Sequence, residues 1–459
     1  MPLRSAATPS GGRTNAQTPL TSQGYSGRSA ISIGPAALNN SGPASLQAAV
    51  QFVRRHSLVV VLTLILVAHL VSVAYVSGTR HLSVGTTYLA LVLVAYALIF
   101  LVTGRFAPLY AKLGSLTGRV AFHPVTATIS IGVIIFPVVF LVLARRVPML
   151  EMWFSSDYYV ASNIRHDFYD NLAGHQKYIL DYYLRGLAPF WILYTYLNRS
   201  KYFAPVLIAS TFLAFVIVTK ISILILLLPL TAYLAFRGRW IKMAIAIAGI
   251  LALMGANVII QSKDTLVIQS ADTTTENPNQ VEAGEVVDYA KVAAYSAAEG
   301  IMSRALYVHG LVETQWLDLY PDAKPFENGC GYRWLASFIG CDFVNMPREV
   351  WLHYYPDLKA RGLLGSVTAS DYVTAYSNFG MVGVGICALL MALLLNLVGS
   401  IYQSAALALC LNLAPLALSL ESPISTLLNS GGWGLTILLS LLFLGSSDPA
   451  PTPKVKELI

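Results

Sequence analysis

The candidate chemistry of this sequence begins with a cation that lies between two hydrophobic stretches. Lys220 separates the uncharged apolar runs Ala204–Thr219 and Ile221–Phe236. An ammonium group at such a place must reach water or an anion. Two interpretations stay open: Lys220 either extends to the interface between membrane and water, or it contacts a phosphate at headgroup depth.

Arg304 is a second cation among apolar neighbours, within Met302–Leu306. Apolar residues recur along 286–318 at intervals that predict a helix with one apolar face. A planar guanidinium can bind two phosphate oxygens at once, so Arg304 is a candidate phosphate ligand. The alternative is a surface ion pair with a carboxylate such as Glu299.

Three residues are candidate general bases: His309, His353 and Asp371. His309 and Glu313 are four residues apart, so a helix places both on one face. A carboxylate there can orient an imidazole that accepts a proton. An ordinary solvated helix face shows the same spacing.

Further candidate anion ligands lie in polar segments. Arg165 stands beside His166, and the mostly cationic run 348–361 contains Arg348 and Arg361. Loops of this composition can wrap an anionic ligand, and a solvated connection near the membrane is the alternative. Convergence of several such cations would be more specific than any one of them.

The composition indicates the class of protein in which these residues lie. The chain has 459 residues, of which 56% are hydrophobic and only 12% charged, whereas soluble domains carry roughly a quarter charged residues. Runs of about 20 apolar residues can cross a bilayer as helices. We therefore predict an all-α polytopic membrane protein of about ten transmembrane helices, at 57–77, 85–104, 124–144, 178–197, 203–219, 221–236, 240–260, 371–398, 402–420 and 431–446.

The predicted spans divide the chain into five parts. Residues 1–50, rich in Ser, Gly, Ala, Asn and Pro, are expected to be a disordered tail. Helices one to seven fill 51–261, and the last three fill 371–446. Between them, 262–370 forms one large polar loop that we expect to be partly helical, with loop at 265–285 and irregular structure at 321–370. Residues 447–459 form a second tail.

Charge asymmetry predicts the orientation in the membrane. With both termini in the cytoplasm, the cytoplasmic segments hold fifteen of the thirty cations and two of the twenty-three carboxylates. Cytoplasmic loops are enriched in Lys and Arg, so the loop 262–370 is expected outside. The net charge of +7 then reflects orientation and not nucleic-acid binding.

The cysteines are compatible with this orientation. Cys387 and Cys410 lie in apolar spans, whereas Cys330 and Cys341 bracket ten residues of the large loop. An external, oxidising compartment permits a disulfide, and two free thiols are the alternative. The sequence contains no GxxxxGK[ST], CxxC or HExxH motif, and its scattered histidines do not indicate a metal site.

Several motifs together resemble one family. A span after the long loop opens with Tyr376-Ser377-Asn378-Phe379-Gly380, and Val218-Thr219-Lys220 precedes an Ile/Leu-rich span. Arg304 lies ahead of the Phe-Gly span, and an early polar segment leads to the aromatic stretch 178–196. From about residue 160 to 400 this layout resembles the Wzy-type oligosaccharide repeat-unit (O-antigen, exopolysaccharide) polymerases. The N-terminal tail is not part of that pattern.

The resemblance implies a glycosyltransferase of the C type, embedded in the bacterial inner membrane and needing neither metal nor cofactor. Its substrate would be a glycan on undecaprenyl diphosphate, and its partners would be membrane lipids and a chain-length-regulating co-polymerase, with no nucleic acid. Lys220, Arg304 and Arg165 are the first candidates for binding the diphosphate, followed by Arg348 and Arg361. Trp316, Trp334 and Trp351 can stack on sugars or anchor the protein at the interface.

Three other functions stay open. An O-antigen ligase would share the fold and donor but use a lipid A core acceptor. A transporter of polysaccharide or lipid-linked sugar would carry charges within its spans, and the predicted spans are nearly free of charge. A non-catalytic assembly scaffold is the third alternative.

Overall fold

The computed structural model describes residues 56–103, 123–155, 158–273, 307–363, 365–402 and 404–444. Every regular element in these ranges is helical, so the all-α prediction is confirmed for them. Five of the described helices are long and apolar enough to cross a membrane: α2 (Ser57–Ser77), α3 (Leu82–Thr103), α5 (His123–Ala144), α12 (Trp240–Thr273) and α18 (Asp371–Ile401). The chain is therefore a membrane-embedded protein.

The other predicted spans correspond to shorter apolar helices: α10 (Phe203–Val216), α11 (Lys220–Phe236), α19 (Ala405–Leu418) and α21 (Trp433–Phe443). The predicted span 178–197 lies in a helical stretch made of α8 (Gly174–Tyr182), a π-helical turn η2 (Tyr183–Leu187) and α9 (Ala188–Leu197). A count of ten spans and an external loop at 262–370 stay predictions, as do the disordered tails, which lie outside the described residues.

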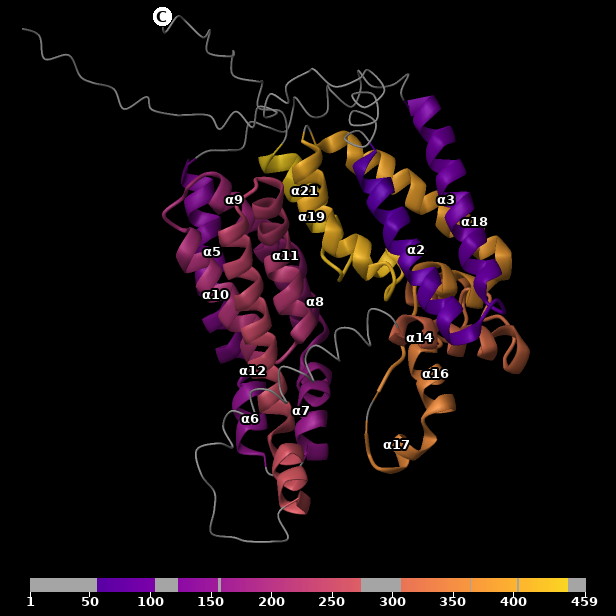
Figure 1. The fold of residues 1–459 in the computed structure, drawn as a ribbon, viewed down its shortest axis with the longest axis horizontal. Coiled ribbons are helices and arrows are strands. Elements are labelled where there is room, and N and C mark those ends of the chain that lie inside the picture. Colours follow the sequence, from indigo (N-terminus) through magenta and orange to yellow (C-terminus); the bar gives the residue numbers. More distant parts are fainter. Residues whose placement is uncertain are drawn as a thin grey trace, which may run out of the picture.

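The helices form two bundles that share two members (Figure 1). One bundle contains α5 and α8 to α12 around a buried core that includes Phe190 and Trp191. The other contains α2, α3, α18 and the helices between residues 309 and 354, around Tyr88, Trp316 and Tyr372. α19 and α21 contribute side chains to both cores and lie between the bundles. These two helices join the halves into one body.

The turn between α10 and α11 is tight, since only Ile217, Val218 and Thr219 separate the two helices. Val218 has a φ of 60° and is fully buried, although a β-branched side chain disfavours that backbone region. Its core neighbours are Met152, Ile164 and Ile260. Packing against these side chains offsets the local strain, and α11 begins directly at Lys220.

Two expectations for the large polar segment were wrong. α12 continues to Thr273, where we expected loop from residue 265, because no Gly or Pro interrupts the chain until Pro278. Within 321–370, expected to be irregular, the structure has three short helices: α15 (Arg333–Ile339), α16 (Met346–Tyr354) and α17 (Pro356–Ala360). Pro347 and Pro356 occupy first helical turns, where proline starts a helix and does not break it.

The polar segments before α8 also form helices. α6 (Pro148–Phe154) and α7 (Tyr158–Asn171) lie at one end of the first bundle, near the far end of α12 (Figure 1). In the second bundle, a short helix α14 (His309–Asp318) packs against α2. Asp318 pairs with Arg80 at 3.0 Å and with His81 at 3.0 Å, so the end of α14 is tied to the turn between α2 and α3.

The contact of α14 with α2 is close because Gly310 has no side chain. Its amide donates to Ser72 Oγ at 3.0 Å, and a Cβ built there would lie 2.2 Å from the Ser72 carbonyl oxygen. The two backbones therefore approach more closely than any larger residue allows.

We expect Gly310→Ala to destabilise the protein by about 1–3 kcal/mol, because overpacking forces the two helices apart. The measurement is the thermal midpoint of the purified protein in detergent. The control is Gly132→Ala in α5, where an added Cβ meets nothing within 4 Å. If Gly310→Ala changes the thermal midpoint no more than Gly132→Ala does, the close contact between α14 and α2 is contradicted.

Cys330 and Cys341 form a disulfide in the structure, across α15, with their Cα atoms 6.0 Å apart. Cys387 and Cys410 are free and buried. This pairing links the segment before α15 to the segment after it.

Alkylation counted by mass spectrometry tests the pairing. Unfolded but unreduced protein should take up two labels, on Cys387 and Cys410, and reduced protein should take up four, because the chain has four cysteines. Four labels before reduction, in protein isolated with its thiols blocked at lysis, would show that the disulfide does not form in the cell.

Candidate functional site

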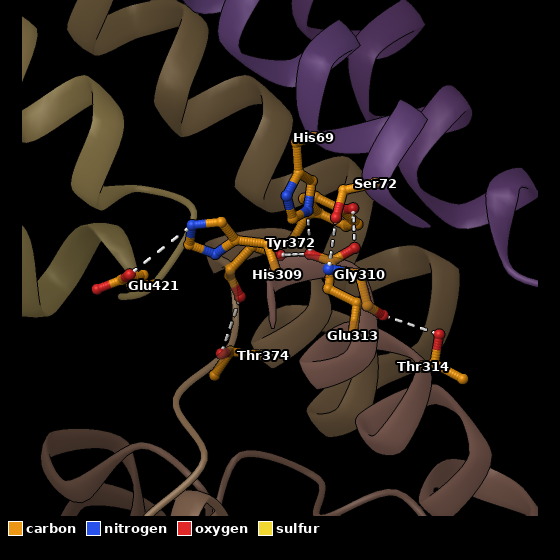
Figure 2. A network of polar contacts seen from close by, with 10 residues as sticks. His69, Ser72, His309, Gly310, Glu313, Thr314, Tyr372, Thr374 and Glu421 are labelled. Carbon is orange, nitrogen blue, oxygen red and sulfur yellow. Dashed lines mark hydrogen bonds and ion pairs between the residues drawn. The ribbon is translucent and has the colours of Figure 1, made fainter. Parts of the chain in front are cut away.

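A buried carboxylate joins three helices of the second bundle. Glu313 of α14 is 1% exposed and accepts hydrogen bonds from Ser370 Oγ and Tyr372 OH, both at 2.5 Å. Its Oε1 atom lies 2.6 Å from Nε2 of His69, a fully buried residue of α2 (Figure 2). A carboxylate taken out of water is costly unless it is paired and hydrogen-bonded, and these three partners meet that need.

The His69 ring is close to Glu313 but is not aligned for a directed hydrogen bond. Neither ring nitrogen has a hydrogen-bond partner of acceptable geometry within the described part of the chain. The 2.6 Å approach is therefore a close contact between an imidazole and a carboxylate without hydrogen-bond alignment. The two side chains form a buried ionisable pair within the second bundle.

His309 continues this network toward the surface. Its ring lies 5.8 Å from the His69 ring, centroid to centroid, and its Nε2 atom is 3.8 Å from Glu421 Oε1. Figure 2 shows His309 between Glu421 on one side and His69 with Glu313 on the other. The side chains of His309 and Glu421 are 21% and 31% exposed, so ionisable groups extend from a dry interior to solvent.

The sequence placed His309 and Glu313 on one helix face, but it did not identify His69. The sequence does contain a feature that points to His69. The span 57–77 has no Asp, Glu, Lys or Arg, and His69 is its one histidine. An ionisable side chain within a membrane span indicates function by default.

Asp371, the third candidate base, faces away from this network. Its Oδ1 atom accepts a hydrogen bond from the Ile424 amide at 2.8 Å, and the Cys387 thiol donates to its other oxygen. The next residue, Tyr372, reaches Glu313. The first turn of α18 thus separates two environments.

Asp371 lines a cavity of about 750 Å³ that runs beside α18 as far as Leu397. The wall is mostly apolar, with Leu390 and Leu394 among its members, and Tyr332 lies near the Asp371 end. Burial raises the pKa of the Tyr332 phenol above its usual value, and the Asp371 carboxylate adds to the rise. Tyr332 therefore adds a phenol to the mostly apolar wall of this cavity.

The Phe-Gly motif marks a break in α18. Gly380 has a φ of 61° and a ψ of −148° inside the helix, which frees carbonyl groups one turn earlier. The amide of Glu327 donates to Ser377 O at 3.1 Å, and that of Asn328 donates to Asn378 O at 2.9 Å. Broken membrane helices are tolerated where other protein groups satisfy the freed backbone, and the segment before the disulfide does so here.

The candidate phosphate ligands are only partly described. Arg348 is exposed on α16 and shares a cavity of about 280 Å³ with His166, Asp170 and Lys359. Arg361 follows α17 and is exposed, as is the candidate base His353 on α16. Arg165 lies within α7 and Lys220 begins α11, but their side chains, like all of Arg304, are outside the described residues.

Two of the three tryptophans proposed to stack on sugars are not available for it. Trp316 is fully buried and donates from Nε1 to Val367 O at 2.9 Å, and Trp351 is 8% exposed. Trp334 is 63% exposed and contributes to the 750 Å³ cavity. Trp334 alone of the three keeps a free face.

No protein-family model, no curated protein and no solved structure matches this chain. Within the described ranges, no three His, Cys, Asp or Glu side chains are grouped so that they could hold a metal ion. The fold and the site define a helical membrane protein with an acid–base network beside an apolar cavity.

Removing the Glu313 carboxylate should destabilise the protein. Glu313→Ala leaves Ser370 and Tyr372 without their buried acceptor, at roughly 1–3 kcal/mol for each orphaned group. It also removes the carboxylate that His69 contacts. Glu313→Gln keeps one acceptor oxygen and should cost less. The measurement is the thermal midpoint in detergent, with Glu421→Gln as the partly exposed control. Equal midpoints for Glu313→Ala and the control would contradict a central role for this carboxylate.

Proposed function

We propose that this chain is a membrane glycosyltransferase that polymerises oligosaccharide repeat units carried on undecaprenyl diphosphate. In this proposal about ten spans cross the bacterial inner membrane, both termini lie in the cytoplasm, and the polar loop 262–370 lies on the periplasmic side. The supporting observation is that an acid–base network and a long apolar cavity meet at the first turn of α18.

The reaction needs a base for the acceptor hydroxyl. As that oxygen bonds to the anomeric carbon, its proton passes to the base, and the bond from the anomeric carbon to the diphosphate oxygen breaks. The diphosphate leaves with the electron pair of that bond. Fixed cations that stabilise the developing charge supply much of the rate enhancement in such steps.

His309 suits the role of base best among the three candidates. It is accessible to solvent and lies near Glu421, whose carboxylate can stabilise a protonated imidazole. Asp371 already accepts from the Ile424 amide and from Cys387, and His353 is an exposed residue of α16. Lys220, Arg304, Arg165, Arg348 and Arg361 stay the candidate ligands of the diphosphate.

The test is polymerisation by the purified protein of lipid-diphosphate-linked repeat units. The wild type should produce a ladder of products, whereas a ligase acting on this substrate alone would produce none. His309→Ala should slow the reaction by about 100-fold or more. Arg304→Ala and Lys220→Ala should each lower the rate of polymerisation. His353→Ala is the matched control. Full ladders from all three substituted proteins would rule out these assignments.

One observation favours a second candidate function, a proton-coupled transporter of lipid-linked sugar. His69 and Glu313 form a buried ionisable pair beside a membrane span, and such pairs occur in proton relays. In proteoliposomes, a transporter would move the lipid-linked sugar between leaflets in response to a pH gradient. Polymerisation without a gradient, and unaffected by one, would favour the glycosyltransferase.

A further inference from the structure

A second polar cavity, of about 370 Å³, lies at the opposite end of the first bundle from α7. It is formed where α9 meets α10 and where α11 meets α12, and its residues include Arg199, Arg237, Arg239, Lys242, Tyr196 and Tyr233. Nothing in the proposed reaction uses this end of the molecule. The four cations come from two turns that are separate in sequence, so the fold brings them together.

Among the residues that the structure describes, these four cations have no carboxylate partner. Within the described ranges, no Asp or Glu lines the cavity or forms an ion pair with any of them. Elsewhere in the structure, Arg80, Arg146, Arg185 and Lys324 each pair with a carboxylate. The cavity therefore concentrates positive charge that the described part of the chain leaves unneutralised, and a nearby anion would be attracted to it.

Backbone and aromatic contacts hold the two turns in place. Arg239 Nη1 donates to Tyr196 OH at 2.7 Å, which links one turn to the other. The Arg237 guanidinium lies 5.9 Å from the centre of the Tyr233 ring. Arg199 and Gly238 adopt left-handed φ values of 49° and 64°, and the amide of Arg239 closes its turn onto Leu234 O at 2.9 Å. These contacts order the cavity wall before any ligand binds.

An apolar surface begins directly beside the cavity. Phe236, Trp240, Ile241 and Ile245 are all exposed, Ile241 by 79%. They belong to the last turn of α11 and the first turns of α12, and α12 is one of the helices apolar enough to span a membrane. A ligand bound here would meet cations at its charged end and hydrocarbon-facing side chains next to it.

We propose that this cavity binds the phosphate headgroup of an anionic membrane glycerophospholipid, whose acyl chains lie against the start of α12. Basic pockets between membrane helices suit such headgroups. An inorganic phosphate would use the same cations but none of the apolar surface. The proposal does not depend on the glycosyltransferase function, because the cavity is remote from the network around Glu313.

The test compares lipids on the purified full-length protein by native mass spectrometry. Phosphatidylglycerol should bind more tightly than phosphatidylcholine, and inorganic phosphate should not displace it at equal concentration. Arg237→Gln should weaken phosphatidylglycerol binding about tenfold, because it removes one charge-assisted contact. The matched control is Lys201→Gln. Lys201 is an exposed cation of the turn between α9 and α10, but Lys201 itself does not line the cavity.

Arg199→Gln provides a second variant on the other turn, and an unchanged thermal midpoint without lipid shows that each variant is folded. Equal binding of the two lipids would overturn the proposal, and so would phosphatidylglycerol binding that survives both substitutions. Displacement by inorganic phosphate would assign the site to a free anion instead. Loss of polymerisation in His309→Ala would leave this result unchanged, since the two sites are tested by different measurements.

Discussion

The Glu313 carboxylate is the interaction on which the second bundle depends. It accepts from the end of one polar segment and the start of α18, and it lies against an imidazole of α2. Each of these polar groups would be costly to bury alone, and together they supply one another with much of the polar contact that burial removes. The close approach at Gly310 follows from it, since α14 must lie directly on α2 to bring Glu313 to His69.

α18 organises both environments of the candidate site. Its consecutive residues Asp371 and Tyr372 face an apolar cavity and an ionisable network respectively. A few residues later the helix breaks at Gly380, and the segment just before the disulfide supplies the missing amide donors. The first turns of one membrane helix therefore carry a polar network, a cavity mouth and the attachment point of the polar segment.

Sequence patterns predicted the helices well where apolar length decides the structure. Each predicted span overlaps a helical stretch of the structure, because burial of backbone in hydrocarbon leaves few alternatives. The expectation of irregular structure at 321–370 was wrong, because Pro347 and Pro356 lie in the first turns of α16 and α17, where proline is compatible with a helix. The His309–Glu313 spacing indicated a shared helix face. The residues that contact these two, His69 and Glu421, come from distant parts of the chain. Such long-range contacts leave no local periodicity to detect.

The burial of His69 has a consequence for biogenesis. Helices of membrane proteins enter the bilayer in the order in which they are synthesised, so the span with residue 69 is placed long before residue 313 is made. During that interval the imidazole lies in an apolar span without the carboxylate that it contacts in the folded protein. The contact forms only when α14 docks on α2, so this buried pair is completed late in assembly.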